Sequence, residues 1–218
     1  MAGTESISVR TFRRHNGVAL IGLAATFLLS TGIACGADGE GGGKGTAPSR
    51  GNSVGVVDLD GHPVDLFQHD KNKAEVFIFI ASDCPISNRY APELRRLAEA
   101  FNPKGIRFRL VYPNADDSSP VIRKHVADYA LSMPVIRDPD HTLVHKAKVR
   151  VTPEAAVFLP DGTLIYHGRI DDRYVDFGKD RPEPTQRDLQ EILTQILAGR
   201  RLTESSTRAV GCTIPEER

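Results

Sequence analysis

A buried strand that leads into a cysteine at the start of a helix constrains this chain more than any other feature. Residues 76–80 form a continuous run of β-branched and aromatic side chains, which is typical of a strand covered on both faces. After a short turn over 81–83, Cys84 precedes apolar residues at helical spacing, namely Ile86, Tyr90, Leu94, Leu97, Ala98 and Phe101. The pattern therefore places Cys84 between a buried strand and the N-terminus of an amphipathic helix.

This position has a chemical consequence for the Cys84 thiol. The first-turn N–H groups of a helix have no partner within the helix, and the helix dipole is positive there. We therefore expect the pKa of Cys84 to lie below the free value of roughly 8.5. Pro85 suits a first helical turn, whereas the neighbouring Asp83 carboxylate would offset part of the effect. The alternative is that Cys84 is a small buried core residue.

The remaining pattern predicts a chain of the α/β class. We expect a hairpin around Asp60-Gly61, strands over 106–112, 155–159 and 164–168, an extended piece over 133–137, and helices after Pro120, over 141–148 and from Thr185. Strands linked by helices, then a hairpin and a last packing helix, predict a central mixed sheet with helices on both faces.

Two segments resemble the thioredoxin superfamily. The motif Cys84-x-x-Ser87 is similar to the thioredoxin Cys-x-x-Cys with its second cysteine replaced, and Pro92 lies where thioredoxins carry a proline inside the helix. Thr152-Pro153, placed before a strand and an Asp-Gly turn, resembles their cis-proline element. The resemblance covers residues 53–197 and is closest to the alkyl hydroperoxide reductase/thiol-specific antioxidant branch, the redoxins, with its membrane-tethered thiol–disulfide relatives.

The resemblance implies a thioredoxin-like fold and a substrate groove. In that family the cis-proline loop sits against the active-site cysteine and offers backbone groups to an extended partner chain, which gives Thr152 and Pro153 a substrate-binding role here. The alternative for Pro153 is an ordinary trans proline. Ser87 can hydrogen-bond to a thiolate but cannot form a disulfide, so the local motif has one thiol; alternatively, Ser87 has no chemical role.

A second candidate thiol lies in the C-terminal tail, outside the domain. Cys212 belongs to an apolar stretch, Ala-Val-Gly-Cys-Thr-Ile-Pro, within an otherwise polar segment. We propose Cys84 as the attacking thiolate and Cys212 as the thiol that resolves the resulting mixed disulfide or sulfenic acid. The alternatives are a structural disulfide and a free tail thiol. The cysteines and histidines lack zinc spacing, and no metal or other cofactor is expected.

Three functions fit these residues. The first is a thiol–disulfide oxidoreductase acting on protein thiols and disulfides, with an electron donor that the sequence does not identify. The second is an antioxidant thiol peroxidase acting on small peroxides. Peroxiredoxins carry Thr or Ser three residues before their cysteine and Pro four residues earlier, whereas Ala81 and Phe77 stand there, so disulfide exchange ranks first. The third is a non-catalytic binding or copper-delivery module, although the Cys-x-x-x-Cys of copper-delivery relatives is missing.

The N-terminal residues indicate export. Arginines precede an apolar run over 18–29, and small residues follow, which is the order of a secretory signal over residues 1–37. Cleavage near 34–37, lipidation of Cys35 as in a bacterial lipoprotein, and an uncleaved membrane anchor are the three alternatives. A glycine-rich linker over 38–52, the redoxin domain over 53–199 and the tail over 200–218 complete the chain. We expect a periplasmic or cell-envelope location, free or membrane-anchored.

Charge excludes one class of partner. Lys plus Arg number 28 and Asp plus Glu number 28, and no basic stripe with interleaved aromatic residues occurs, so nucleic-acid binding is excluded. The charged segment 168–178 contains Arg169, Asp171, Asp172 and Arg173. These residues either line a rim near the site or form a solvated loop, and we expect the loop.

Overall fold

The computed structural model describes residues 55–67 and 71–216. The predicted signal over 1–37, the linker over 38–52 and the lipidation candidate Cys35 therefore lie outside the described residues. The elements in chain order are β1 (Ala74–Phe79), α1 (Pro85–Phe101), a 3₁₀ helix (Asn102–Lys104), β2 (Ile106–Tyr112), α2 (Ser119–Asp128), β3 (Val135–Arg137), α3 (Thr142–Ala147), β4 (Val151–Thr152), β5 (Glu154–Phe158), β6 (Leu164–Gly168), β7 (Tyr174–Asp176), β8 (Lys179–Asp180), α4 (Asp188–Leu197), β9 (Ser205–Ser206) and β10 (Cys212–Thr213).

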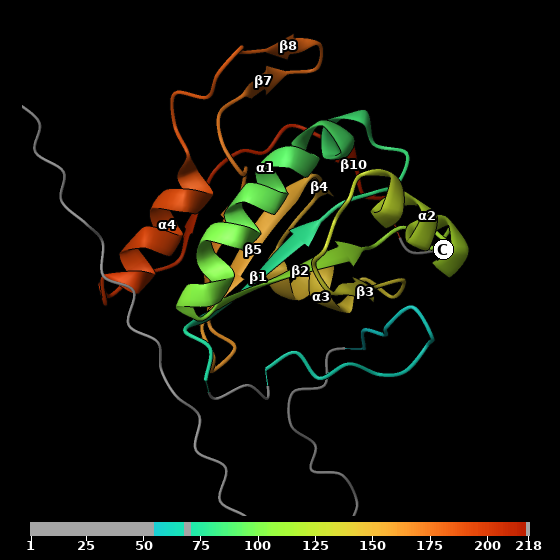
Figure 1. Ribbon diagram of the computed structural model, residues 1–218, viewed down its shortest axis with the longest axis horizontal. Coiled ribbons are helices and arrows are strands. Elements are labelled where there is room, and N and C mark those ends of the chain that lie inside the picture. The colour runs from blue at the N-terminus through green and yellow to red at the C-terminus, as the bar shows by residue number, and fades with distance from the viewer. Residues whose placement is uncertain (1–54, 68–70, 217–218) are drawn as a thin grey trace, which may run out of the picture. The chain divides into compact units, whose positions relative to one another are not determined.

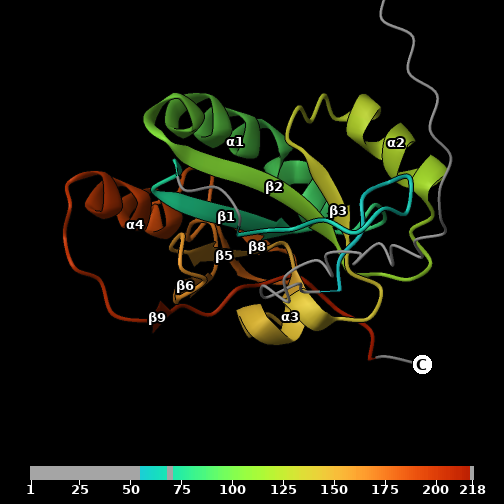
Figure 2. The same ribbon diagram turned by 90° about the horizontal axis from the view of Figure 1, so that it is seen from below.

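Six of these strands form one mixed sheet in the order β3-β2-β1-β5-β6-β9. β1 runs parallel to β2, with α1 as the crossover, and antiparallel to β5. β5 and β6 form the hairpin predicted around Asp161-Gly162. Figures 1 and 2 show α1, α2 and α4 on one face of the sheet and α3 on the other. The predicted central mixed sheet with helices on both faces is therefore confirmed.

β1 is buried on both faces because its side chains enter two separate cores. Val76 and Ile78 pack in the core that also holds the apolar faces of α1 and α4. Phe77 and Phe79 point the other way and pack in the core that holds α3. Successive side chains of a strand point to opposite faces, so a strand between two cores needs an unbroken apolar run. This requirement explains residues 76–80 and fixes the position of the turn that carries Cys84.

Two local predictions were wrong in extent. The hairpin around Asp60-Gly61 is reduced to a bridge between Val57 and Pro63, flanked by hydrogen bonds from Asp58 N to the His62 carbonyl and from Val64 N to the Val56 carbonyl. The last helix begins at Asp188 rather than Thr185, because the Thr185 N–H donates to Asp172 Oδ1 at 2.6 Å outside the helix. No helix within 55–67 and 71–216 has the length and apolar content needed to cross a membrane.

The expectation that segment 168–178 is a solvated loop was wrong for its first part, whereas residues 175–178 are exposed. Asp171 and Asp172 are buried, with exposed fractions of 2% and 6%, and the segment leads into the short hairpin β7–β8. The Tyr90 hydroxyl of α1 donates to Asp171 Oδ1 at 2.6 Å, and the Tyr90 and Tyr174 rings pack together. The segment is therefore tied to the helix that follows Cys84, which its charged composition does not reveal.

Removal of the Tyr90 hydroxyl tests this tie. In Tyr90→Phe the buried Asp171 carboxylate loses the hydrogen bond donated by the tyrosine hydroxyl, which costs about 1–3 kcal/mol of unfolding free energy. Urea denaturation followed by circular dichroism measures the loss. Tyr129→Phe is the matched control, because no hydrogen bond of the Tyr129 hydroxyl occurs within the described part of the chain. Equal stability of Tyr90→Phe and the control would show that the tie contributes nothing.

Candidate active site

Cys84 is the N-cap residue of α1, at the end of the turn that follows β1. Its backbone is extended, with φ −83° and ψ 110°, and its carbonyl accepts the first helical hydrogen bond from Asn88 N at 3.1 Å. The side chain is fully buried. Its Sγ donates to the Thr152 carbonyl oxygen at 3.0 Å, so the thiol lies directly against the loop before Pro153.

The tail brings a second thiol to the same point. β10 pairs antiparallel with β4, and this pairing places Cys212 opposite Thr152. Cys212 Sγ lies 2.7 Å from Cys84 Sγ, and both thiols are free. A disulfide needs a separation of roughly 2.05 Å. The two sulfurs are therefore in contact, and a two-electron oxidant with a small movement would join them.

The surroundings of Cys84 favour its thiolate. Burial raises the pKa of the thiol, but hydrogen bonds from the Cys212 thiol, the Ser87 side chain and the Ser87 backbone N–H outweigh burial, so the pKa is lowered from 9.0. The Ser87 backbone N–H is one of the first-turn donors of α1, which is the effect predicted from the sequence. Asp83 is exposed and is not among the groups that shift this pKa.

Cys212 is affected in the opposite direction. Burial raises its pKa, and the hydrogen bond to Cys84, the negative charge of Cys84 and the Asp83 carboxylate raise it further, to about 12. Cys84 therefore loses its proton at a lower pH than Cys212, so the two thiols differ in readiness to attack.

The three other predicted site residues lie around this pair. The Thr152-Pro153 peptide bond is cis, as the resemblance implied, and Thr152 is 2% exposed. The Thr152 hydroxyl donates to the Cys212 carbonyl at 3.4 Å. Ser87 is 3% exposed, and its Oγ has no hydrogen-bond partner of good geometry in the described chain, although it acts on the Cys84 sulfur. The structure thus brings together Cys84, Cys212, Ser87, Thr152 and Pro153.

A polar network that the sequence did not reveal holds the turn before Cys84. Ser82 donates to the buried Asp117 carboxylate through both its backbone N–H, at 3.3 Å, and its hydroxyl. Asn88 donates to the Ser82 carbonyl at 3.4 Å and contacts His125 Nε2 at 2.7 Å. Burial lowers the pKa of His125, against opposing effects of Asp117 and Asp128. These residues are separated in sequence, and no spacing pattern marks them.

The described residues also bear on metal binding. Within 55–67 and 71–216, no three His, Cys, Asp or Glu side chains gather as a metal site would require. The donors nearest the candidate nucleophile are a thiol, a serine hydroxyl and a backbone carbonyl. This set suits sulfur exchange, because it orients and charges one thiol beside another.

The chain is similar to several solved structures. An uncharacterized conserved protein from Geobacillus kaustophilus is 25% identical, with a TM-score of 0.64, and the match covers 75% of this chain and 88% of that one. A hypothetical protein from Sinorhizobium meliloti 1021 is 21% identical, with a TM-score of 0.62, covering 73% and 88%. A secreted Mycobacterium tuberculosis disulfide oxidoreductase is 23% identical, with a TM-score of 0.44, covering 66% and 94%.

The family assignment comes from the sequence comparison. No curated protein is a significant match to the chain. The AhpC/TSA family model matches residues 47–167, which include β1, the Cys84 turn, α1 and the cis-proline loop. The fold is thioredoxin-like, with a mixed sheet between helices and the cysteine at the start of α1. The chain is thus a thioredoxin-like redoxin and belongs to the AhpC/TSA family.

Proposed function

We propose that this redoxin is an exported thiol–disulfide oxidoreductase in which Cys84 attacks and Cys212 resolves. The observation that carries the proposal is the 2.7 Å contact between the two sulfurs at the helix N-terminus, with the Cys84 pKa lowered and the Cys212 pKa raised. The asymmetry supports distinct roles, because the thiolate is the nucleophile in disulfide exchange. The signal-like order of residues 1–37 supports export.

The reaction proceeds in two exchanges. In the first, the Cys84 thiolate attacks one sulfur of a substrate disulfide, that disulfide bond breaks, and the other substrate sulfur leaves as a thiolate. In the second, Cys212 gives its proton to solvent, and the resulting thiolate attacks Cys84 Sγ. The bond between Cys84 and the substrate then breaks, and the substrate leaves as a second thiolate. The substrate gains two electrons, and the Cys84–Cys212 dithiol becomes a disulfide.

The structure also supports the order of these steps. While Cys84 is a thiolate, burial of Cys212 together with the hydrogen bond and the charge of Cys84 holds the Cys212 pKa at about 12, so Cys212 is a poor nucleophile. A mixed disulfide at Cys84 removes that negative charge. The pKa of Cys212 then falls, and Cys212 becomes reactive when there is a bond for it to break. An external thiol reductant must return the finished disulfide to the dithiol, and the reverse sequence oxidises a substrate dithiol.

Peroxide reduction is the second candidate, because the matching family includes alkyl hydroperoxide reductases. The same pair of thiols could convert a Cys84 sulfenic acid into a disulfide with loss of water. However, Ala81 and Phe77 stand where peroxiredoxins carry a hydroxyl and a proline, and both are buried in the sheet cores. Disulfide exchange therefore remains the first candidate. Peroxide consumption by the purified protein, in the presence of a thiol reductant, distinguishes the two.

The thiolate character of Cys84 can be measured directly. The ultraviolet absorbance of thiolate, followed against pH, should show a step with a midpoint below 9.0 that is missing in Cys84→Ala. Ser87→Ala should move this midpoint upward, because it removes one of the hydrogen bonds that favour the thiolate. Ser118→Ala, at the N-cap of α2, is the control and should leave the midpoint unchanged. A Cys84 midpoint at or above 9.0 would contradict the assignment of Cys84 as the thiolate.

The resolving role of Cys212 predicts a trapped intermediate. With oxidised glutathione, the unmodified protein should form a Cys84–Cys212 disulfide and release all of the glutathione. Cys212→Ser should instead accumulate one glutathione on Cys84, because no second thiol is present to break the mixed disulfide. Peptide mapping by mass spectrometry under acid-quenched conditions measures both products.

Thr213→Ser, an exposed conservative change in the same strand, is the matched control and should behave as the unmodified protein. If the unmodified protein retained glutathione to the same extent as Cys212→Ser, Cys212 would not be the resolving thiol.

A further inference from the structure

The tail lies in the groove beside Cys84 as an added strand. Cys212 and Thr213 of β10 pair antiparallel with Thr152 and Val151 of β4. The pairing continues for one bond, since Ile214 N donates to the Arg150 carbonyl at 3.0 Å. Strand addition of this kind gives affinity through backbone bonds and specificity through side-chain positions. The tail therefore shows what an extended chain must look like to occupy this groove.

The position before the cysteine accepts no side chain. A Cβ on Gly211 would lie 2.2 Å from the Thr152 carbonyl oxygen and 2.6 Å from its carbonyl carbon. These are backbone atoms of a fully buried residue that also accepts the Cys84 thiol. Backbone atoms cannot move aside as a flexible side chain can, so any larger residue here displaces the strand.

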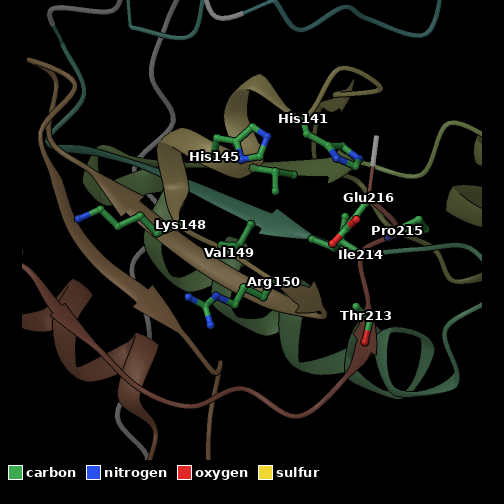
Figure 3. A pocket seen from close by; sticks show the side chains of 10 residues that line it. His141, His145, Lys148, Val149, Arg150, Thr213, Ile214, Pro215 and Glu216 are labelled. Carbon is green, nitrogen blue, oxygen red and sulfur yellow. The ribbon is translucent and has the colours of Figure 1, made fainter. Parts of the chain in front are cut away.

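The position two residues after the cysteine requires an apolar side chain. Ile214 is 8% exposed and belongs to the core cluster that contains Val144 and Val149. Thr213, between them, is exposed and carries no such constraint. Beyond Ile214 a cavity of about 640 Å³ opens between the tail and α3. Figure 3 shows tail residues 213–216 along this cavity, which leaves room for a chain to continue.

A substrate and the tail compete for this place. Cys84 is fully buried, and Cys212 Sγ already lies against its sulfur, so a substrate sulfur reaches Cys84 only after something moves. The tail strand is the element that covers Cys84, and its ladder with β4 has two residue pairs, extended by the one bond from Ile214 N to the Arg150 carbonyl. So short a two-stranded ladder is marginal by itself.

The family resemblance already implies that the strand before Pro153 receives an extended partner chain. We propose that the partner's reactive segment reads Gly-Cys-x-aliphatic and that it competes with the tail by binding to β4, the docking edge, in the place now held by residues 211–214. This proposal rests on the proposed function and names its partner class. The tail must leave for the partner to bind. After Cys84 has formed the mixed disulfide, the returning tail displaces the partner strand and brings Cys212 to the bond that it breaks.

A binding experiment tests the proposal without thiol chemistry. The probe is a fluorescent peptide copying residues 208–216 with serine in place of the cysteine, Arg-Ala-Val-Gly-Ser-Thr-Ile-Pro-Glu. Anisotropy is measured with the full chain carrying Gly211→Val, whose own tail cannot dock. We expect this variant to bind at least about tenfold more tightly than the unmodified chain or the Thr213→Val control, because a tail that docks weakly still competes.

Selectivity provides the second part of the test. Peptides with valine in place of the glycine, or aspartate in place of the isoleucine, should bind the Gly211→Val chain at least about tenfold more weakly than the probe. Equal binding of the three peptides, or no binding of the probe to a folded variant whose tail has left the groove, would overturn the proposal. Ile214→Asp is a second variant with an undocked tail, for use if Gly211→Val does not fold. Faster alkylation of Cys212 than in the unmodified chain confirms that the tail has left.

The outcomes separate this inference from the proposed function. Selective peptide binding by a chain that fails to form the Cys84–Cys212 disulfide contradicts the redox cycle and leaves the docking edge standing. A working cycle in a chain that binds all three peptides equally contradicts the docking edge alone.

Discussion

The carbonyl group of Thr152 is the point on which the arrangement of the site depends. It accepts the Cys84 thiol at 3.0 Å, and it lies where any side chain on Gly211 would have to go. The same residue pairs with Cys212 in the added strand. One buried peptide group therefore fixes the distance from the loop to the helix N-terminus and the distance from the tail to both. Because the group is backbone, it holds these distances whatever side chain stands at position 152.

The second constraint is the rigidity of the helix that begins at Cys84. β1 lies between two cores, so the turn that follows it has a fixed position. Asp117 binds the backbone and side chain of Ser82 in that turn, and Asp171 binds Tyr90 one and a half turns into α1. Two buried carboxylates from different segments thus hold the start of the helix. The Ser87 N–H in its first turn stays directed at the Cys84 sulfur, which preorganises the site for a negative charge.

The parts of this structure that could be predicted from the sequence are those encoded locally. The apolar run over 76–80, the amphipathic face of α1 and the 155–168 hairpin each follow from periodicity and turn residues, and the cis bond before Pro153 followed from a motif. The segment 168–178 could not be predicted, because a charged composition does not distinguish a solvated loop from one whose carboxylates find buried partners. Gly211 was also missed, since its importance lies in a contact with Thr152, which is far away in the sequence.

The two thiols illustrate how a single contact orders a reaction. Two identical side chains 2.7 Å apart cannot both ionise, because the first negative charge opposes the second. The hydrogen bonds from the Cys212 thiol and from the Ser87 side chain and backbone N–H favour ionisation of Cys84 first. Conversion of Cys84 into a disulfide removes the charge that kept Cys212 protonated, so the second thiol becomes reactive as a consequence of the first step. The first exchange thus removes one of the causes that, with burial, keep the proton on Cys212.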